Sequence, residues 1–76
     1  MIEIYTKDEC IYCAMAKATM QFRGIEYVER KLHEDFDRET ILKKFAPQTG
    51  FPFIVVDNVL IGGYTDLLEY YKKGTV

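Results

Sequence analysis

Two cysteines separated by two residues, Cys10 and Cys13, are the first feature of this 76-residue sequence that could do chemistry. A CxxC pair can act as a redox dithiol or supply half of a metal site. The redox role needs a thiolate, and a thiol with an ordinary pKa near 8.5 is only about 3% ionised at pH 7. The surroundings of the pair must therefore lower the pKa of one cysteine for fast reaction.

The position of the pair predicts unequal roles for its members. Cys10 follows a predicted strand, Ile2 to Thr6, and precedes a predicted helix, whose N-terminus favours an anion. The helix dipole supplies at most about 2 kcal/mol, or about 1.5 pKa units, so backbone N–H groups, the Cys13 thiol and Lys7 would have to help. Cys10 is the predicted nucleophile. Cys13 is predicted to be buried on the same side and to resolve mixed disulfides.

Zinc binding is the main alternative for the pair. A structural zinc site needs four ligands, and His33 is the only histidine in the sequence, without a partner histidine. His33 stands among acidic residues in a predicted loop, which is typical of a solvated surface side chain. The sequence therefore favours redox chemistry over an intrachain zinc site.

Hydrophobic periodicity predicts the elements that position the pair. Cys13, Ala16 and Met20 form one stripe of a helix that runs from Ile11 to Arg23, with Gly24 as its stop. A second strand is predicted at Glu26–Leu32, followed by a helix from the N-cap Asp37 to Ala46 and a loop at Pro47–Gly50. Two more strands, Phe53–Val56 and Val59–Ile61, are predicted to be joined by an Asp57-Asn58 turn. The last predicted helix has Thr65 as its N-cap, Leu67, Leu68 and Tyr71 on its inward face, and Gly74 beyond its end. The first strand, helix and second strand predict a right-handed parallel βαβ unit. The order is βαβαββα, an α/β fold with CxxC at the carboxyl end of the first strand, where sites of open α/β sheets gather.

Composition narrows the classes of function. The chain is 49% apolar and 29% charged, which predicts one compact domain over residues 1–76. Its net charge of −2 and lack of a basic run argue against nucleic-acid binding. The first nine residues lack a basic leader pattern, and no apolar run approaches the ~18 residues of a membrane span. We expect a cytoplasmic protein.

Four motifs in register make the chain resemble glutaredoxins along nearly its whole length. They are Tyr5-Thr6-Lys7, Cys10-Ile11-Tyr12-Cys13 with Ala16-Lys17 downstream, Phe51-Pro52, and Ile61-Gly62-Gly63-Tyr64-Thr65-Asp66-Leu67. The resemblance implies a thioredoxin-like fold with a four-stranded mixed sheet flanked by three helices. It also implies reduction of protein disulfides and glutathione mixed disulfides with glutathione as co-substrate and no tightly bound cofactor. A monomer is expected, and ribonucleotide reductase is a family-level expectation for a protein substrate.

The same resemblance implies a glutathione site. Its residues would be Lys7, Tyr12, Gln48, Phe51, Pro52, Thr65 and Asp66. Thr65 and Asp66 would hold the γ-glutamyl end, Lys7, Tyr12 and Gln48 would line the groove toward the glycyl carboxylate, and the Phe51 backbone would pair with the peptide. Pro52 would be cis, although the general rate of cis X-Pro bonds, about 5–6%, favours trans. Simple helix capping is the alternative for Thr65 and Asp66, and a partly exposed aromatic without a role is the alternative for Tyr12.

Two departures from the family pattern leave alternatives open. Ile11 stands where dithiol glutaredoxins usually have proline, and in the family loss of that proline accompanies some dimers that hold a [2Fe-2S] cluster through the first cysteine of each copy, here Cys10, and two glutathiones. Gly50 and Phe51 stand where the family usually has threonine and valine, which changes the loop before Pro52. A third hypothesis is a thioredoxin-like donor recharged by a flavoprotein reductase, against which Lys7, Thr65 and Asp66 argue.

Overall fold

The computed structural model describes residues 1–72 and has the predicted element order βαβαββα. Its elements are β1 (Ile2–Thr6), α1 (Ile11–Phe22), β2 (Val28–Lys31), α2 (Arg38–Lys44), β3 (Phe53–Val56), β4 (Val59–Gly62) and α3 (Tyr64–Lys72). The predicted second strand is longer than β2, and the predicted second helix extends past the end of α2 at its C-cap, Phe45. Gly74, predicted to follow the last helix, lies outside the described residues. Within residues 1–72 no helix is long and apolar enough to cross a membrane.

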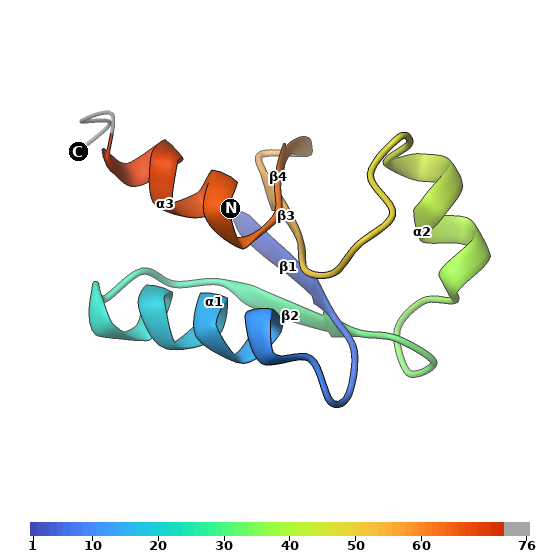
Figure 1. Ribbon diagram of the computed structural model, residues 1–76, viewed down its shortest axis with the longest axis horizontal. Helices are drawn as coiled ribbons and strands as arrows, with labels where there is room; N and C mark the ends of the chain where they lie inside the picture. Colours follow the sequence, from blue (N-terminus) through green and yellow to red (C-terminus); the bar gives the residue numbers. More distant parts are fainter. Residues whose placement is uncertain (73–76) are drawn as a thin grey trace.

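The four strands form one mixed sheet in the order β2-β1-β3-β4 (Figure 1). β1 pairs in parallel with β2 and antiparallel with β3, and β3 pairs antiparallel with β4. Asp57 and Asn58 have positive φ angles of 49° and 69°, so the predicted two-residue hairpin turn is confirmed. The parallel β1–α1–β2 unit brings the start of α1 to the carboxyl end of β1.

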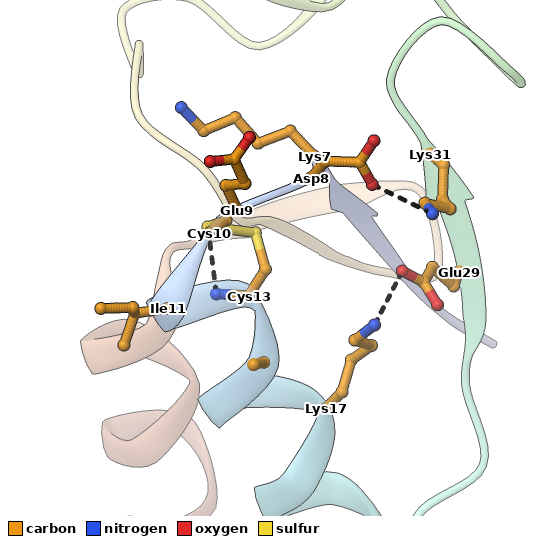
Figure 2. A pocket seen from close by; sticks show the side chains of 10 residues that line it. Lys7, Asp8, Glu9, Cys10, Ile11, Cys13, Lys17, Glu29 and Lys31 are labelled. Carbon is orange, nitrogen blue, oxygen red and sulfur yellow. Dashed lines mark hydrogen bonds and ion pairs between the residues drawn. A yellow bond between two sulfur atoms is a disulfide. The ribbon is translucent and has the colours of Figure 1, made fainter.

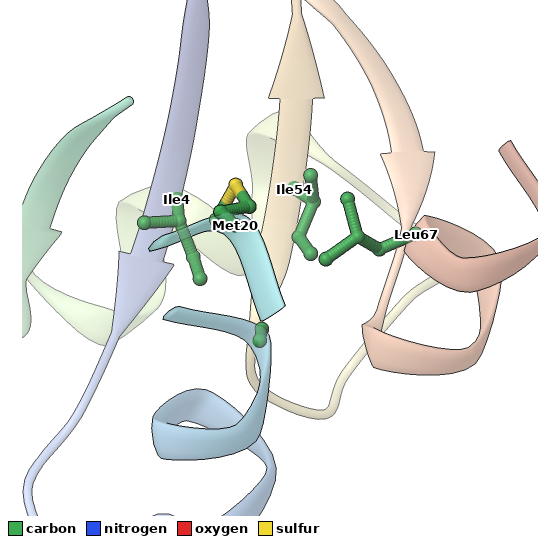
Figure 3. Packing of buried hydrophobic residues seen from close by; sticks show 5 residues of the cluster. Ile4, Met20, Ile54 and Leu67 are labelled. Atoms are coloured by element: carbon green, nitrogen blue, oxygen red, sulfur yellow. The ribbon is translucent and has the colours of Figure 1, made fainter. Parts of the chain in front are cut away.

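Residues that alternate along the central strands divide the core between the two faces of the sheet. Ile4 and Ile54 are directly opposite on β1 and β3 and pack with residues of α1 and α3 (Figure 3). The buried members of this first cluster are Ile4, Ala16, Met20, Ile54 and Leu67. The predicted inward stripe of α1 is therefore confirmed.

The second face of the sheet is covered by α2. Its cluster consists of Tyr5, Ile41, Phe45, Phe53 and Val55. Asp37 begins α2 by accepting a hydrogen bond from the Thr40 N–H at 2.8 Å, so its predicted role as N-cap is confirmed. This hydrogen bond from the Thr40 backbone holds the pKa of the Asp37 carboxyl below its usual value.

Candidate active site

The two cysteines are joined as a disulfide at the first turn of α1, with their Cα atoms 5.2 Å apart (Figure 2). Cys10 is the N-cap of α1 and keeps an extended backbone, with φ −117° and ψ 105°. Its side chain is partly exposed, whereas Cys13 lies inside the helix and is 2% exposed. An incoming disulfide can therefore reach the sulfur of Cys10 more readily than that of Cys13.

The backbone of α1 contributes directly to the environment of the Cys10 sulfur. The Cys13 N–H donates to Cys10 Sγ at 3.2 Å, as predicted for a donor that would stabilise a thiolate. Lys7 takes a different place: its ammonium lies over the Phe51 ring, 5.8 Å from the centroid, and its side chain leads away from the disulfide (Figure 2). The first turn of α1 thus donates directly to the Cys10 sulfur, whereas the Lys7 ammonium lies at the Phe51 ring.

The loop before β3 is held by a side chain. Gln48 Nε2 donates to the carbonyl oxygens of Gly50 at 2.9 Å and of Pro52 at 3.0 Å. The Phe51–Pro52 peptide bond is cis, as the resemblance implied, and Ala46–Pro47 is also cis, which the sequence did not predict. Because both hydrogen bonds of the Gln48 amide nitrogen go to the loop, its contact with glutathione stays a prediction.

A groove of about 180 Å³ collects four of the residues predicted for glutathione. It is lined by Tyr12, Phe51, Pro52, Tyr64 and Thr65. Sequence reasoning missed Tyr64, whose ring centroid lies 6.0 Å from that of Tyr12; its place beside Thr65 in the motif was the available signal. Lys7 approaches this groove through its contact with Phe51.

The start of α3 corrects the prediction that Thr65 is an N-cap. The helix begins at Tyr64, and the Leu67 N–H donates to the Gly63 carbonyl at 3.0 Å, so Gly63 holds the cap position. Asp66 Oδ2 accepts the Gly63 N–H at 2.9 Å, which is the reciprocal half of a capping box. The cap is thus built from Asp66, and Thr65 stands in the first turn, where it lines the groove.

A second cavity, of about 530 Å³, also borders the disulfide. Its lining is largely charged and comprises Lys7, Asp8, Glu9, Cys10, Ile11, Cys13, Ala14, Lys17, Glu29 and Lys31 (Figure 2). Glu29 Oε2 accepts hydrogen bonds from the Thr6 hydroxyl at 2.7 Å and from the Lys17 ammonium at 3.0 Å. Lys31 forms an ion pair with Asp8 at 3.2 Å. Sequence reasoning missed the Lys17–Glu29 pair, whose only signal was the place of Lys17 one helical turn after Cys13.

The Glu29 carboxyl is the perturbed acid of this cavity. Burial by itself raises its pKa, but the hydrogen bonds from Thr6 and Lys17 and the Lys17 charge outweigh burial, so the pKa lies below its ordinary value of 4.5. His33, the histidine considered as a metal ligand beside the two cysteines, is exposed as predicted. Among residues 1–72, no cluster of three or more His, Cys, Asp or Glu side chains could hold a metal ion.

A helix-capping cysteine with a buried partner, together with a cis proline directly before β3 of the same sheet, is typical of a thiol-disulfide oxidoreductase of the thioredoxin-like class. Residues 2–61 match the glutaredoxin family model, and the chain belongs to the glutaredoxin family. Glutaredoxin 3 of Escherichia coli K12 is 33% identical over 73 residues, which cover 96% of this chain and 88% of that protein. These matches confirm the class of enzyme and the redox-active CxxC pair predicted from the sequence.

Solved structures confirm the predicted fold. Glutaredoxin 1 from Francisella tularensis, complexed with cacodylate, superposes with a TM-score of 0.81 at 28% identity, covering 95% of this chain and 92% of that one. A buckwheat glutaredoxin–glutathione complex superposes with a TM-score of 0.83 at 22% identity, covering 96% and 69%. The four-stranded mixed sheet with three helices is therefore a glutaredoxin fold.

Replacement of Gly62 tests the start of α3. A Cβ at Gly62 would lie 2.2 Å from Asp66 Oδ2, and its φ of +127° is strained for any residue with a side chain. We expect Gly62→Ala to lower the free energy of unfolding by about 2 kcal/mol or more, measured by denaturant titration. Gly50→Ala is the matched control, because nothing lies within 4 Å of its Cβ position. Equal stability of the two variants would contradict the Gly62–Asp66 contact.

The lowered pKa of Glu29 predicts a pH dependence of stability. Because the folded-state pKa is depressed, the stabilisation is present above the ordinary pKa of 4.5 and is lost as the pH falls through the folded value. Glu29→Gln should therefore lose less unfolding free energy than wild type between pH 7 and about pH 3. Glu69→Gln, at an exposed carboxylate of α3, is the control. An unchanged loss in Glu29→Gln would contradict the pairing with Lys17 and Thr6.

Proposed function

We propose that this glutaredoxin reduces protein disulfides and glutathione mixed disulfides with glutathione as reductant, Cys10 attacking and Cys13 resolving. The observation that carries this proposal is the asymmetric pair at the start of α1, with Cys10 partly exposed and Cys13 2% exposed. The Cys13 N–H at 3.2 Å from Cys10 Sγ would stabilise negative charge on the attacking sulfur. Burial keeps the resolving thiol away from competing substrates.

The proposed cycle balances without a resident cofactor. The Cys10 thiolate attacks one sulfur of a substrate disulfide, and the other substrate sulfur leaves as a thiolate that takes a proton from water. Cys13, once its thiol has lost a proton to solvent, attacks the Cys10 sulfur, releases the second substrate sulfur and closes the Cys10–Cys13 disulfide. Two glutathione molecules then restore the dithiol and are themselves oxidised to one glutathione disulfide.

The groove beside the disulfide supports glutathione as the reductant. Tyr12, Pro52 and Thr65 line one concave surface, and Lys7 can supply a cation at its Phe51 side. We propose that Thr65 and Asp66 hold the γ-glutamyl end, that Phe51 pairs through its backbone, and that Lys7, Tyr12 and Gln48 face the glycyl carboxylate. The buckwheat relative that shares this fold was solved as a glutathione complex.

The protein substrate, the cellular location and the bridging [2Fe-2S] cluster stay predictions. Ribonucleotide reductase is a candidate substrate from the family resemblance alone, and the cytoplasm is the expected location.

A cluster shared by two copies would need a reduced Cys10 from each, whereas Cys10 here is bonded to Cys13. Anaerobic reconstitution with glutathione tests this alternative, because a brown dimer would favour the cluster and a colourless monomer would contradict it.

Serine variants of the two cysteines test the proposed roles. Cys10→Ser should lose at least about a hundredfold of kcat/KM for a glutathione mixed disulfide, because it removes the nucleophile. Cys13→Ser should retain turnover of that substrate by a monothiol route and lose reduction of intramolecular protein disulfides. The enzyme proposal is falsified if Cys10→Ser keeps its activity. Recharging of wild type by a flavoprotein reductase but not by glutathione would favour the thioredoxin-like alternative.

Lys7 provides a separate test of the glutathione site. An exposed ion pair contributes about 0.2–1 kcal/mol, so Lys7→Gln should raise KM for a glutathione mixed disulfide by up to about fivefold and leave kcat unchanged. Added salt should shrink the difference, because it screens the same charge. Lys43→Gln, at an exposed lysine of α2, removes an equal charge from another element and should leave KM unchanged. Equal KM values for the two variants would contradict the role of Lys7.

A further inference from the structure

Helix α1 is apolar on two opposite faces. Its inward face buries Cys13, Ala16 and Met20. On the opposite face, positions i, i+4, i+7 and i+11 carry Ile11, Met15, Ala18 and Phe22, which we call the outer stripe. Ile11 is 75% exposed, Met15 39% and Phe22 93%. The sheet and α3 cover the inward face, whereas Ile11 and Phe22, at the two ends of the outer stripe, are left largely uncovered by residues 1–72.

Helix α3, which packs beside α1 on the same face of the sheet, shows the usual pattern. Its exposed residues are polar or charged: Thr65, Asp66, Glu69 and Lys72. In α1 the long polar side chains lie on a flank instead, where Lys17 pairs with Glu29 and Gln21 donates to Tyr27. The outer stripe itself contains no charged residue, so a complementary surface would be apolar.

The outer stripe is continuous with the place where disulfides react. It begins at Ile11, directly after Cys10, and at 1.5 Å per residue it runs about 16 Å to Phe22. Ile11 is among the residues that line the charged cavity and is itself 75% exposed (Figure 2), and α1 forms a border of the molecule (Figure 1). A protein whose disulfide is attacked by Cys10 therefore has an apolar track beside its point of attachment.

The size of the outer stripe favours a brief contact. A helix of 12 residues is about 18 Å long and about 10 Å wide, so one face offers roughly 180 Å², against the about 800 Å² per partner of a stable interface. A second copy of the chain would not be held firmly by so small a patch alone. Redox encounters, in contrast, occupy the small end of interface sizes and must dissociate after each turnover.

We propose that the outer stripe docks protein substrates whose disulfide is flanked by apolar residues, and that it contributes to the choice of substrate. This inference rests on the proposed function and adds a specificity surface to it. Small glutathione mixed disulfides would not use the surface, because in the proposed function glutathione occupies the groove formed by Tyr12, Pro52 and Thr65.

Synthetic peptides can measure the contribution of the stripe. An extended chain spans about 3.3 Å per residue and Phe22 lies about 18 Å along the helix from Cys10, so at least about six residues are needed to reach Phe22 from a bond to Cys10. Three disulfide peptides are compared: one with an eight-residue flank of leucine and serine, one with the same flank of glutamine and serine, and one with a two-residue flank. Wild type should show a KM about tenfold lower for the long leucine flank than for the other two.

The variants Phe22→Gln and Met15→Gln/Phe22→Gln should remove most of this preference while keeping kcat/KM for a small glutathione mixed disulfide. Glutamine favours helices, and at 93% exposure Phe22 contributes little to folding, so the single variant remains folded. Val59→Thr is the matched control, since it removes a 63% exposed apolar side chain from the distant β3–β4 turn and should keep the preference.

The outcomes separate the stripe from the proposed function. Failure of wild type to turn over any of the peptides or the small mixed disulfide would overturn the proposed function. Normal turnover with equal KM values for the three peptides, or a preference that survives in Phe22→Gln, would overturn the docking surface alone. Sedimentation equilibrium of wild type gives the remaining check: a dimer that Phe22→Gln dissociates would assign the stripe to a second copy instead.

Discussion

The packing of α1 on the central strands determines where the chemistry takes place. Ala16 and Met20 are fully buried against Ile4 and Ile54, and the small side chain of Ala16 lets the helix approach the sheet closely. Once this contact is made, the first turn of α1 must stand at the carboxyl end of β1. The capping position then falls on Cys10, and the Cys13 N–H points at its sulfur.

The same placement divides the surroundings of the disulfide into two unlike sides. On one side Lys17 is paired with Glu29 and Lys31 with Asp8, so the charges of the larger cavity are largely satisfied internally. On the other side the groove is aromatic, and Lys7 stands over Phe51 with no ion pair to any residue between 1 and 72. Lys7 also lines the larger cavity, so this cation stands between the two sides, next to the groove where the glutathione carboxylate is proposed to lie.

Local signals predicted most of the fold, and longer-range constraints account for the errors. The 3.6-residue stripe of α1, the cap at Asp37 and the Asp57-Asn58 turn each depend on neighbouring residues, and each was predicted correctly. The second strand was predicted too long because its length is set by pairing with β1. Residues Glu3 to Thr6 of β1 pair only with residues Val28 to Lys31 of β2. Sequence periodicity cannot reveal how far a partner strand extends.

The candidate site shows the same division. The CxxC pair and four of the five residues that line the groove, all but Tyr64, were predicted from motifs, because their spacing along the chain carries the information. The Lys17–Glu29 ion pair forms only because α1 lies beside β2. The hydrogen bond from the Gln48 amide to the Pro52 carbonyl likewise forms only because of the path that the loop takes around Pro52. Neither pairing could be predicted from the local sequence. The error at Thr65 was local: Asp66 reaches back to the Gly63 N–H, which moves the start of α3 two residues earlier than a threonine cap would allow.

Ile11 stands where the family usually has proline, directly after Cys10 in the first turn of α1. It therefore lies next to the disulfide and begins the outer stripe. A proline there would fix the first turn and present a compact ring, whereas isoleucine presents a larger apolar side chain, 75% of it exposed. The substitution leaves the cap at Cys10 and the buried position of Cys13 intact, since neither depends on the side chain between them. Its physical consequence is therefore outward, where it brings the apolar surface of α1 directly up to the Cys10 sulfur.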